Sequence, residues 1–177
     1  AKLRLADIQF YRGNTDSAKS LYSELSNITN SDIANDALKK IVLFDKNKDL
    51  ISALKKFGKA AFLRYQDEYK EAVKLYDQII AVQTETDLAQ RSFLEKAEIM
   101  RSRENYEEIT SILEKFVKSY TESIYLDRAY LMLGDAYTEI QNPEKAEKFY
   151  TRILVEFPRS IYLEEARSKI RKIREKS

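Results

Sequence analysis

The stretch Leu133-Gly134-Asp135-Ala136-Tyr137, followed by Ala146-Glu147-Lys148-Phe149-Tyr150-Thr151-Arg152-Ile153, decides the fold of this chain. In the second segment, four residues spaced i, i+3, i+4 and i+7 form one apolar helix face: Ala146, Phe149, Tyr150 and Ile153. Between the segments, Asn142-Pro143 predicts a helix start, because Asn is a good N-cap and Pro is favoured at the first helical position. The stretch therefore predicts two helices joined by a short turn.

The same pattern occurs three more times along the 177 residues. The apolar face is repeated at Ile109, Ile112, Leu113 and Phe116, at Ala72, Leu75, Tyr76 and Ile79, and at Ala18, Leu21, Tyr22 and Leu25. Twelve residues before each face stands a small residue, namely Gly134, Ala97, Ala60 and Ala6. A small residue lets the second helix of each pair approach closely. Because one pair of helices cannot cover its own apolar surface, neighbouring pairs must stack into a solenoid.

The composition excludes many classes of enzyme. The chain has no His, no Cys and only three Gly, so it lacks the residues for Ser-His or Cys-His catalysis, the usual zinc sites and a Gly-rich phosphate loop. Lys and Arg number 31 and Asp and Glu 29, a balance that argues against a dedicated nucleic-acid binder. No apolar run is long enough to span a membrane. We therefore expect no catalytic residue, no metal and no cofactor.

Several residues of the first-quoted stretch, with one proline after it, occur in the order and at the spacing of a known repeat: Leu133-Gly134, Tyr137, Ala146, Tyr150 and Pro158. In this respect the chain resembles the tetratricopeptide repeat family. The resemblance is strongest over 127–160, good over 90–123, fair over 53–86 and weaker over 1–32. It implies an all-α fold in which helix pairs form a right-handed superhelix, and a function in binding other proteins or peptides.

The spacing of the small residues predicts where the regular array is interrupted. The steps between them are 54, 37 and 37 residues, so the longest step leaves room for one inserted helix. We expect that helix over about 33–45, where one face is apolar: Ile33, Ala34, Ala37, Leu38, Ile41 and Val42. The whole chain, 1–177, is expected to form a single solenoid with hairpins over about 1–32, 53–86, 90–123 and 127–160 and a capping helix over about 160–175. The first hairpin lacks the start of its first helix, so we expect a fragment of a longer repeat protein.

In this family the first helices of the pairs line a concave groove where partners bind. The resemblance places nine groove candidates on this chain, which combine the aromatic and charged side chains that anchor interfaces: Phe10, Tyr11, Arg64, Tyr65, Arg91, Glu98, Arg101, Arg128 and Asp135. The alternative is that they are ordinary solvated or inter-repeat residues. The carboxylate clamp of chaperone-binding members is absent, because its positions hold residues such as Leu94, Glu98, Leu131 and Asp135.

Two other features have structural explanations. A basic run near the C-terminus could contact anions, but cations also favour the negative end of a helix, and we prefer that explanation: Arg167, Lys169, Arg171, Lys172, Arg174 and Lys176. Four tyrosines occupy packing positions of the repeat and are expected in the core: Tyr22, Tyr76, Tyr137 and Tyr150.

The sequence thus predicts a non-catalytic scaffold or adaptor that binds a protein or peptide in the groove. One alternative is a regulatory or substrate-presenting domain of a larger enzyme. Another is a self-association module that forms homo-oligomers through exposed repeat ends, with open apolar surface at Leu3, Leu5, Ile8 and Phe10. The pattern over 153–166 is similar to repeats of bacterial cell-envelope proteins, such as outer-membrane assembly lipoproteins. It favours a periplasmic location and a role in envelope assembly.

Overall fold

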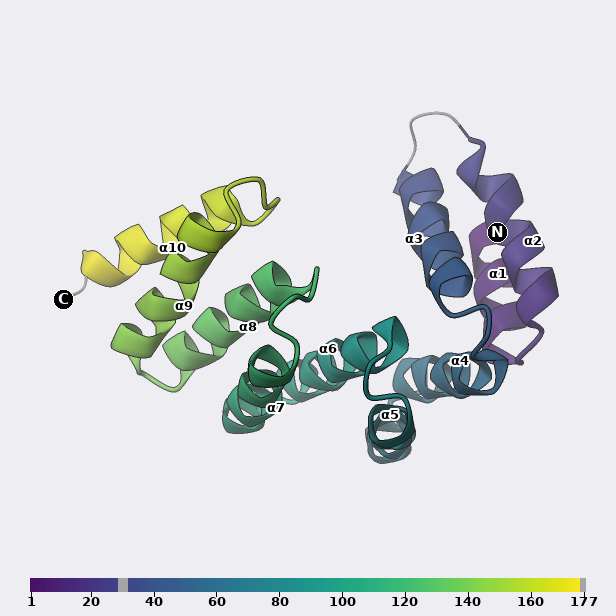
Figure 1. The fold of residues 1–177 in the computed structure, drawn as a ribbon, viewed down its shortest axis with the longest axis horizontal. Helices are drawn as coiled ribbons and strands as arrows, with labels where there is room; N and C mark the ends of the chain where they lie inside the picture. The colour runs from purple at the N-terminus through teal and green to yellow at the C-terminus, as the bar shows by residue number, and fades with distance from the viewer. Residues whose placement is uncertain (29–31, 176–177) are drawn as a thin grey trace. The chain divides into compact units, whose positions relative to one another are not determined.

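The computed structural model describes residues 1–28 and 32–175, and within these ranges it contains ten helices and no strand (Figure 1). The prediction of an all-α, tetratricopeptide-like fold is confirmed. The chain divides into two compact units, residues 1–92 and 93–177. No helix of the described residues is long and apolar enough to cross a bilayer.

The first unit contains two helix pairs and one additional helix. The pairs are α1 (Lys2–Tyr11) with α2 (Thr15–Ser26), and α4 (Ile51–Tyr65) with α5 (Tyr69–Val82). Between them lies α3 (Asp32–Lys46), at the place where the long step predicted an inserted helix. The expected first hairpin ran to residue 32, and its residues 29–31 lie outside the described part. The start of α6 (Asp87–Ser102) completes the unit.

The second unit contains the remainder of α6 and four further helices. These are α7 (Tyr106–Ser119), α8 (Leu126–Glu139), α9 (Pro143–Glu156) and α10 (Leu163–Arg174). Helix α9 packs on both α8 and α10. The basic run lies on α10, and its last member, Lys176, is outside the described residues.

The turns within the pairs share one backbone geometry. A residue with positive φ follows each small residue by seven positions: Gly13 (φ 78°), Asp67 (61°), Glu104 (56°) and Gln141 (58°). The N–H of the next residue donates to a carbonyl five residues earlier at 2.8–3.0 Å, as in a Schellman helix end. Asn142 then caps α9 by accepting from the Lys145 N–H at 3.1 Å, so the predicted N-cap is confirmed. The backbone conformation of the turns therefore repeats with the same spacing as the buried residues.

The four tyrosines at packing positions are buried, as predicted: Tyr22, Tyr76, Tyr137 and Tyr150 have at most 4% of their surface exposed. Gly134 on α8 lies in close contact with α9. A Cβ atom at Gly134 would lie 2.3 Å from the Tyr150 ring, well inside van der Waals contact. The absence of a side chain at residue 134 is therefore what admits Tyr150 between α8 and α9.

The inserted helix α3 buries only part of the face that its apolar periodicity predicted. Its buried residues are Ala34, Ala37, Leu43 and Phe44. Ile33, Leu38 and Val42, which were also expected on that face, are 45%, 47% and 43% exposed, so that part of the prediction is wrong. The large ring of Phe44 determines which side of α3 faces the core, because it packs 5.1 Å from the ring of Phe10 and 6.0 Å from that of Tyr22.

We expect Gly134→Ala to lower the free energy of unfolding by about 1–2 kcal/mol, since overpacking costs about 1–3 kcal/mol and exceeds the gain of about 1 kcal/mol in helix propensity. Urea denaturation followed by circular dichroism measures the change. The matched background is Tyr150→Leu, because the neighbouring pair carries Ala97 and Leu113 at these two register positions. Gly134→Ala should cost clearly less in that background, and an equal cost in both would refute the steric explanation.

Candidate functional site

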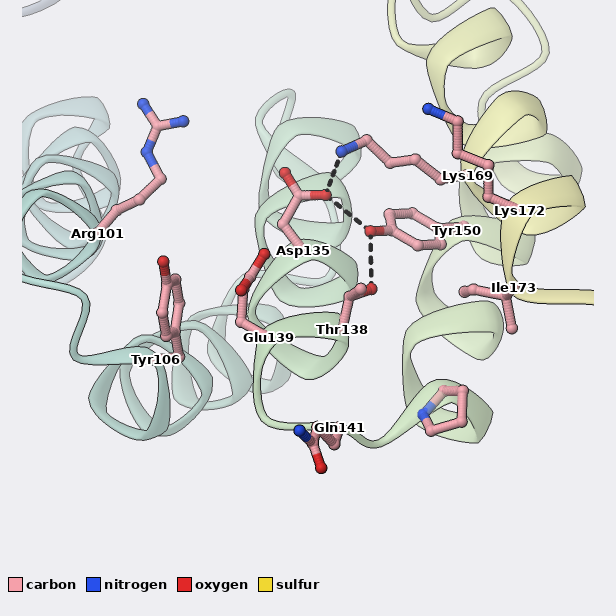
Figure 2. Close-up of a pocket in the computed structure, with 11 residues that line it drawn as sticks. Arg101, Tyr106, Asp135, Thr138, Glu139, Gln141, Tyr150, Lys169, Lys172 and Ile173 are labelled. Atoms are coloured by element: carbon pink, nitrogen blue, oxygen red, sulfur yellow. Dashed lines mark hydrogen bonds and ion pairs between the residues drawn. The ribbon is translucent and has the colours of Figure 1, made fainter. Parts of the chain in front are cut away.

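The second unit contains an open cleft of about 660 Å³ to which five helices contribute (Figure 2). The end of α6 and the start of α7 supply Arg101 and Tyr106. The C-terminal half of α8, the following turn and α9 supply Asp135, Thr138, Glu139, Gln141, Pro143 and Tyr150, and α10 supplies Lys169, Lys172 and Ile173. Two of the nine groove candidates, Arg101 and Asp135, therefore line one cavity.

A hydrogen-bonded centre joins the three C-terminal helices at this cleft. The Tyr150 hydroxyl of α9 donates to Asp135 Oδ1 of α8 at 2.7 Å, and Lys169 Nζ of α10 donates to the same oxygen at 2.7 Å. Thr138 Oγ1 lies 3.3 Å from the Tyr150 hydroxyl oxygen. Figure 2 shows these side chains converging on Asp135. The carboxylate of Asp135 is thus compensated within the protein, and the centre fixes α8, α9 and α10 against one another.

Both partners of Asp135 remain protonated at neutral pH. Burial raises the pKa of Tyr150, and the neighbouring Asp135 and Glu165 raise it further, although the contact with Thr138 acts in the opposite direction. Burial alone would lower the pKa of Lys169, but the hydrogen bond and charge of Asp135, together with Glu165, raise it above its ordinary value. Neither group is therefore available as a base or nucleophile near pH 7.

Two charges of opposite sign remain open in the cleft. Lys172 of α10 and Glu139 of α8 are exposed, and neither forms a hydrogen bond or ion pair with any residue in the described ranges. In Figure 2, Glu139 lies on the side of Tyr106, whereas Lys172 lies on the side of α10. The apolar part of the lining comes from Pro143, Ile173 and the rings of Tyr106 and Tyr150. The cleft is therefore an apolar depression with a cation on one side and an anion on the other.

An ion-pair network adjoins the cleft through Arg101. Glu98 of α6 accepts from Arg101 at 2.6 Å and from Arg128 of α8 at 2.9 Å. The Glu98 side chain is only 12% exposed. Burial lowers the pKa of Arg128, but the hydrogen bond to Glu98 and the nearby carboxylates raise it overall. The structure thus joins two more predicted residues, Glu98 and Arg128, to Arg101, as a support that holds α6 to α8 beside the cleft.

The candidates of the first unit are dispersed. Phe10 is fully buried, beneath Phe44 and Lys40 of α3, and offers no surface to a partner. Tyr11 is half-buried with its ring 5.5 Å from that of Phe62. At the end of α4, Arg64 is half-buried and Tyr65 is 67% exposed. Arg91 is held by Asp87 at 2.7 Å.

Sequence reasoning missed most of the α10 side of the cleft, since that helix was interpreted only as a cap. The repeat step itself carried the missing signal. Glu98, Asp135 and Lys172 are separated by 37 residues each, so Lys172 holds on α10 the position that Glu98 and Asp135 hold on α6 and α8. Thr138 stands in the same relation to Arg101. Tyr106 and Glu139 had no such signal, because neither lies at a position that was expected to face the groove.

Comparison with known families supports the repeat assignment at both ends of the chain. A tetratricopeptide repeat model matches residues 1–28 and 128–160. The second segment contains most of the cleft residues on α8 and α9. No curated protein matches the chain. These two segments are therefore similar to tetratricopeptide repeats, a class of module that generally mediates protein–protein interactions.

We expect Tyr150→Phe to lower the free energy of unfolding at pH 7 by about 1.5–3 kcal/mol, the value of a hydrogen bond to a charged group. This difference from the wild type should shrink above pH 10. The pKa of Tyr150 is raised in the folded state and has its ordinary value of 10.0 in the unfolded chain. As the pH rises above 10, Tyr150 therefore ionises first in the unfolded chain. This ionisation destabilises the wild type, but not the variant, by about 1.4 kcal/mol per pH unit. Urea titrations at pH 7 and pH 11 test this, and an equal difference at both would contradict it.

Proposed function

We propose that the chain is a non-catalytic interaction module that binds a segment of a partner protein in the cleft of the second unit. The observation that carries the proposal is the cleft itself, whose mainly apolar lining also includes the open charges of Lys172 and Glu139. Ligand sites are typically concave and mainly apolar, with a few polar groups that fix orientation. An apolar side chain of the partner would enter the depression, and its polar neighbours would contact the two charges.

The internal contacts of the site support binding rather than chemistry. Asp135 is already bonded to Tyr150 and Lys169, and Glu98 to Arg101 and Arg128. Such contacts fix helix positions before a partner arrives, so little ordering is needed on binding. The raised pKa values of Tyr150 and Lys169 keep both groups protonated. A proton-transfer or nucleophilic step would require the opposite shift for Lys169.

The test uses peptides selected by the wild-type protein from a random peptide display library and labelled for fluorescence anisotropy. Thr138→Trp places a large ring in the cleft, and it should weaken binding at least tenfold, which corresponds to about 1.4 kcal/mol. The matched control is Thr151→Trp on the exposed surface of α9, outside the cleft lining. Equal affinity of wild type and Thr138→Trp for every selected peptide would place the binding site elsewhere.

Charge reversal at the two open groups resolves the orientation of the bound segment. Lys172→Glu should weaken selected peptides that carry a carboxylate, and Glu139→Lys those that carry a cation, whereas Lys115→Glu on the exposed face of α7 should affect neither. Circular dichroism checks that each variant is folded.

A further inference from the structure

Helix α3 covers, in the first unit, a position that is open in the second. Phe10 follows the small residue Ala6 by four positions, as Arg101 follows Ala97 and Thr138 follows Gly134. Arg101 and Thr138 line the cleft of the second unit. Phe10 is instead fully buried, with the ring of Phe44 at 5.1 Å and Lys40 Nζ 5.6 Å from its centroid. The inserted helix therefore occupies the place that a ligand would take on this pair.

The way α3 is seated is that of a helix in a groove. Its small residues Ala34 and Ala37 are buried, and Phe44 provides the large anchor between Phe10 and Tyr22. Anchors on one face of an amphipathic helix are the usual means by which such a helix is recognised. Leu43, on another side of the helix, is also buried, whereas Leu38 and Val42 remain partly exposed.

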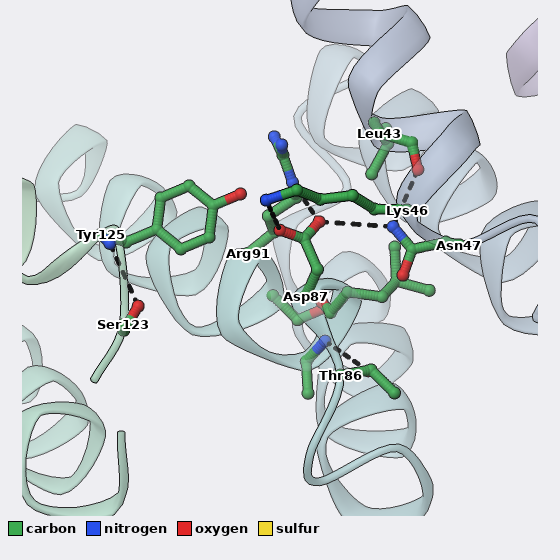
Figure 3. A network of polar contacts seen from close by, with 11 residues as sticks. Leu43, Lys46, Asn47, Thr86, Asp87, Arg91, Ser123 and Tyr125 are labelled. Atoms are coloured by element: carbon green, nitrogen blue, oxygen red, sulfur yellow. Dashed lines mark hydrogen bonds and ion pairs between the residues drawn. The ribbon is translucent and has the colours of Figure 1, made fainter. Parts of the chain in front are cut away.

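Polar contacts fasten the C-terminal end of α3. Asp45 pairs with Lys19 of α2 at 2.6 Å. Lys46 Nζ lies 3.6 Å from Asp87 Oδ1, and the neighbouring Asn47 donates to Asp87 Oδ2 at 3.3 Å (Figure 3). Arg91 donates to the same Asp87 oxygen at 2.7 Å. These charges face outward enough to be reached by water, and the side chains of Asp45 and Lys46 are 57% and 43% exposed.

One polar side chain at this end of α3, Asn47, has an incomplete set of hydrogen bonds among the described residues. Asn47 is 1% exposed, and its amide nitrogen donates to the Leu43 carbonyl and to Asp87. Its buried Oδ1 accepts no hydrogen bond from the described residues. A buried acceptor without a donor opposes the closed arrangement, so the fastening of α3 is weaker than its number of contacts indicates.

We propose that the surface of α1 and α2 beneath α3 is a second binding surface, for an amphipathic helix of a partner protein with the chemistry of α3. That helix carries two small residues three apart, an aromatic residue seven positions after the second, and a carboxylate next to the aromatic that pairs with Lys19. Helix α3 is the resident occupant, and the partner helix replaces it. This surface is separate from the cleft of the second unit, and either can fail without the other.

The experiment exchanges two neighbouring charges, Asp45→Lys with Lys46→Glu. The exchange reverses the two ion pairs that α3 forms with other helices, while leaving the net charge unchanged. The control exchanges Asp36→Lys with Lys39→Glu, a pair 3.1 Å apart on the exposed side of the same helix, where exchange preserves the attraction. Hydrogen exchange is measured for each variant, and the binding probe is a fluorescein-labelled peptide of residues 32–47.

The proposal predicts that the charge swap at residues 45 and 46 increases the rate of amide hydrogen exchange in α3 at least tenfold and leaves the rates in α1 and α2 within twofold of wild type. The probe should bind this variant at least tenfold more tightly than it binds wild type. A probe with Phe44→Ala should not bind, and the control protein should behave as wild type. Joint loss of protection in α1, α2 and α3 would show that α3 is ordinary core and overturn the proposal. Unchanged protection of α3, or release of α3 without probe binding, would overturn it as well.

Discussion

The close approach of the two helices in each pair, made possible by a small residue on the first, is the constraint on which the rest of the structure depends. At Gly134 this approach is so tight that the Tyr150 ring fills the space of the missing side chain. A tyrosine inserted this deeply presents its hydroxyl at the edge of the pair, where the residue after the small one can accept from it. Tyr150 bonds Asp135 at 2.7 Å, and Tyr22 bonds Asp7 at 2.8 Å. Packing thus positions the polar centre of the cleft.

The two units put this arrangement to different use. In the second unit the surface beside the tyrosine–carboxylate contact is open, and α10 adds Lys169, Lys172 and Ile173 to form the cleft. In the first unit the inserted helix covers Phe10. The interruption of the repeat step by one helix therefore changes what the first pair can bind, and the regular pairs of the second unit retain an accessible site.

Much of the fold was predictable because it depends on local patterns. The i, i+3, i+4, i+7 faces, the small residue twelve positions earlier and the Asn142 cap all follow from helix geometry and turn chemistry. The left-handed residues of the turns were not predictable from composition, since only Gly13 among the four is a glycine. The direction in which α3 packs was also hidden, because its apolar residues cover more than one face and the choice depends on where Phe44 meets Phe10 and Tyr22.

The site was less predictable than the fold, for a physical reason. The repeat register identifies which residues share a position in successive pairs, but it does not show which of them already form ion pairs or hydrogen bonds within the protein. Glu98 and Asp135 were both predicted to face the groove, yet both are neutralised by partners within the protein. The groups left open, Lys172 and Glu139, could be recognised only once those pairings were known.

The most direct measurement of where a partner sits is photo-crosslinking from single benzoylphenylalanine residues, with the peptide that the protein selects as the acceptor. One crosslinker replaces Glu139 in the cleft, and the other replaces Val155, which is 73% exposed on α9 and does not line the cleft. The account predicts covalent adducts from position 139 and none from position 155. Adducts from position 155 alone would contradict it.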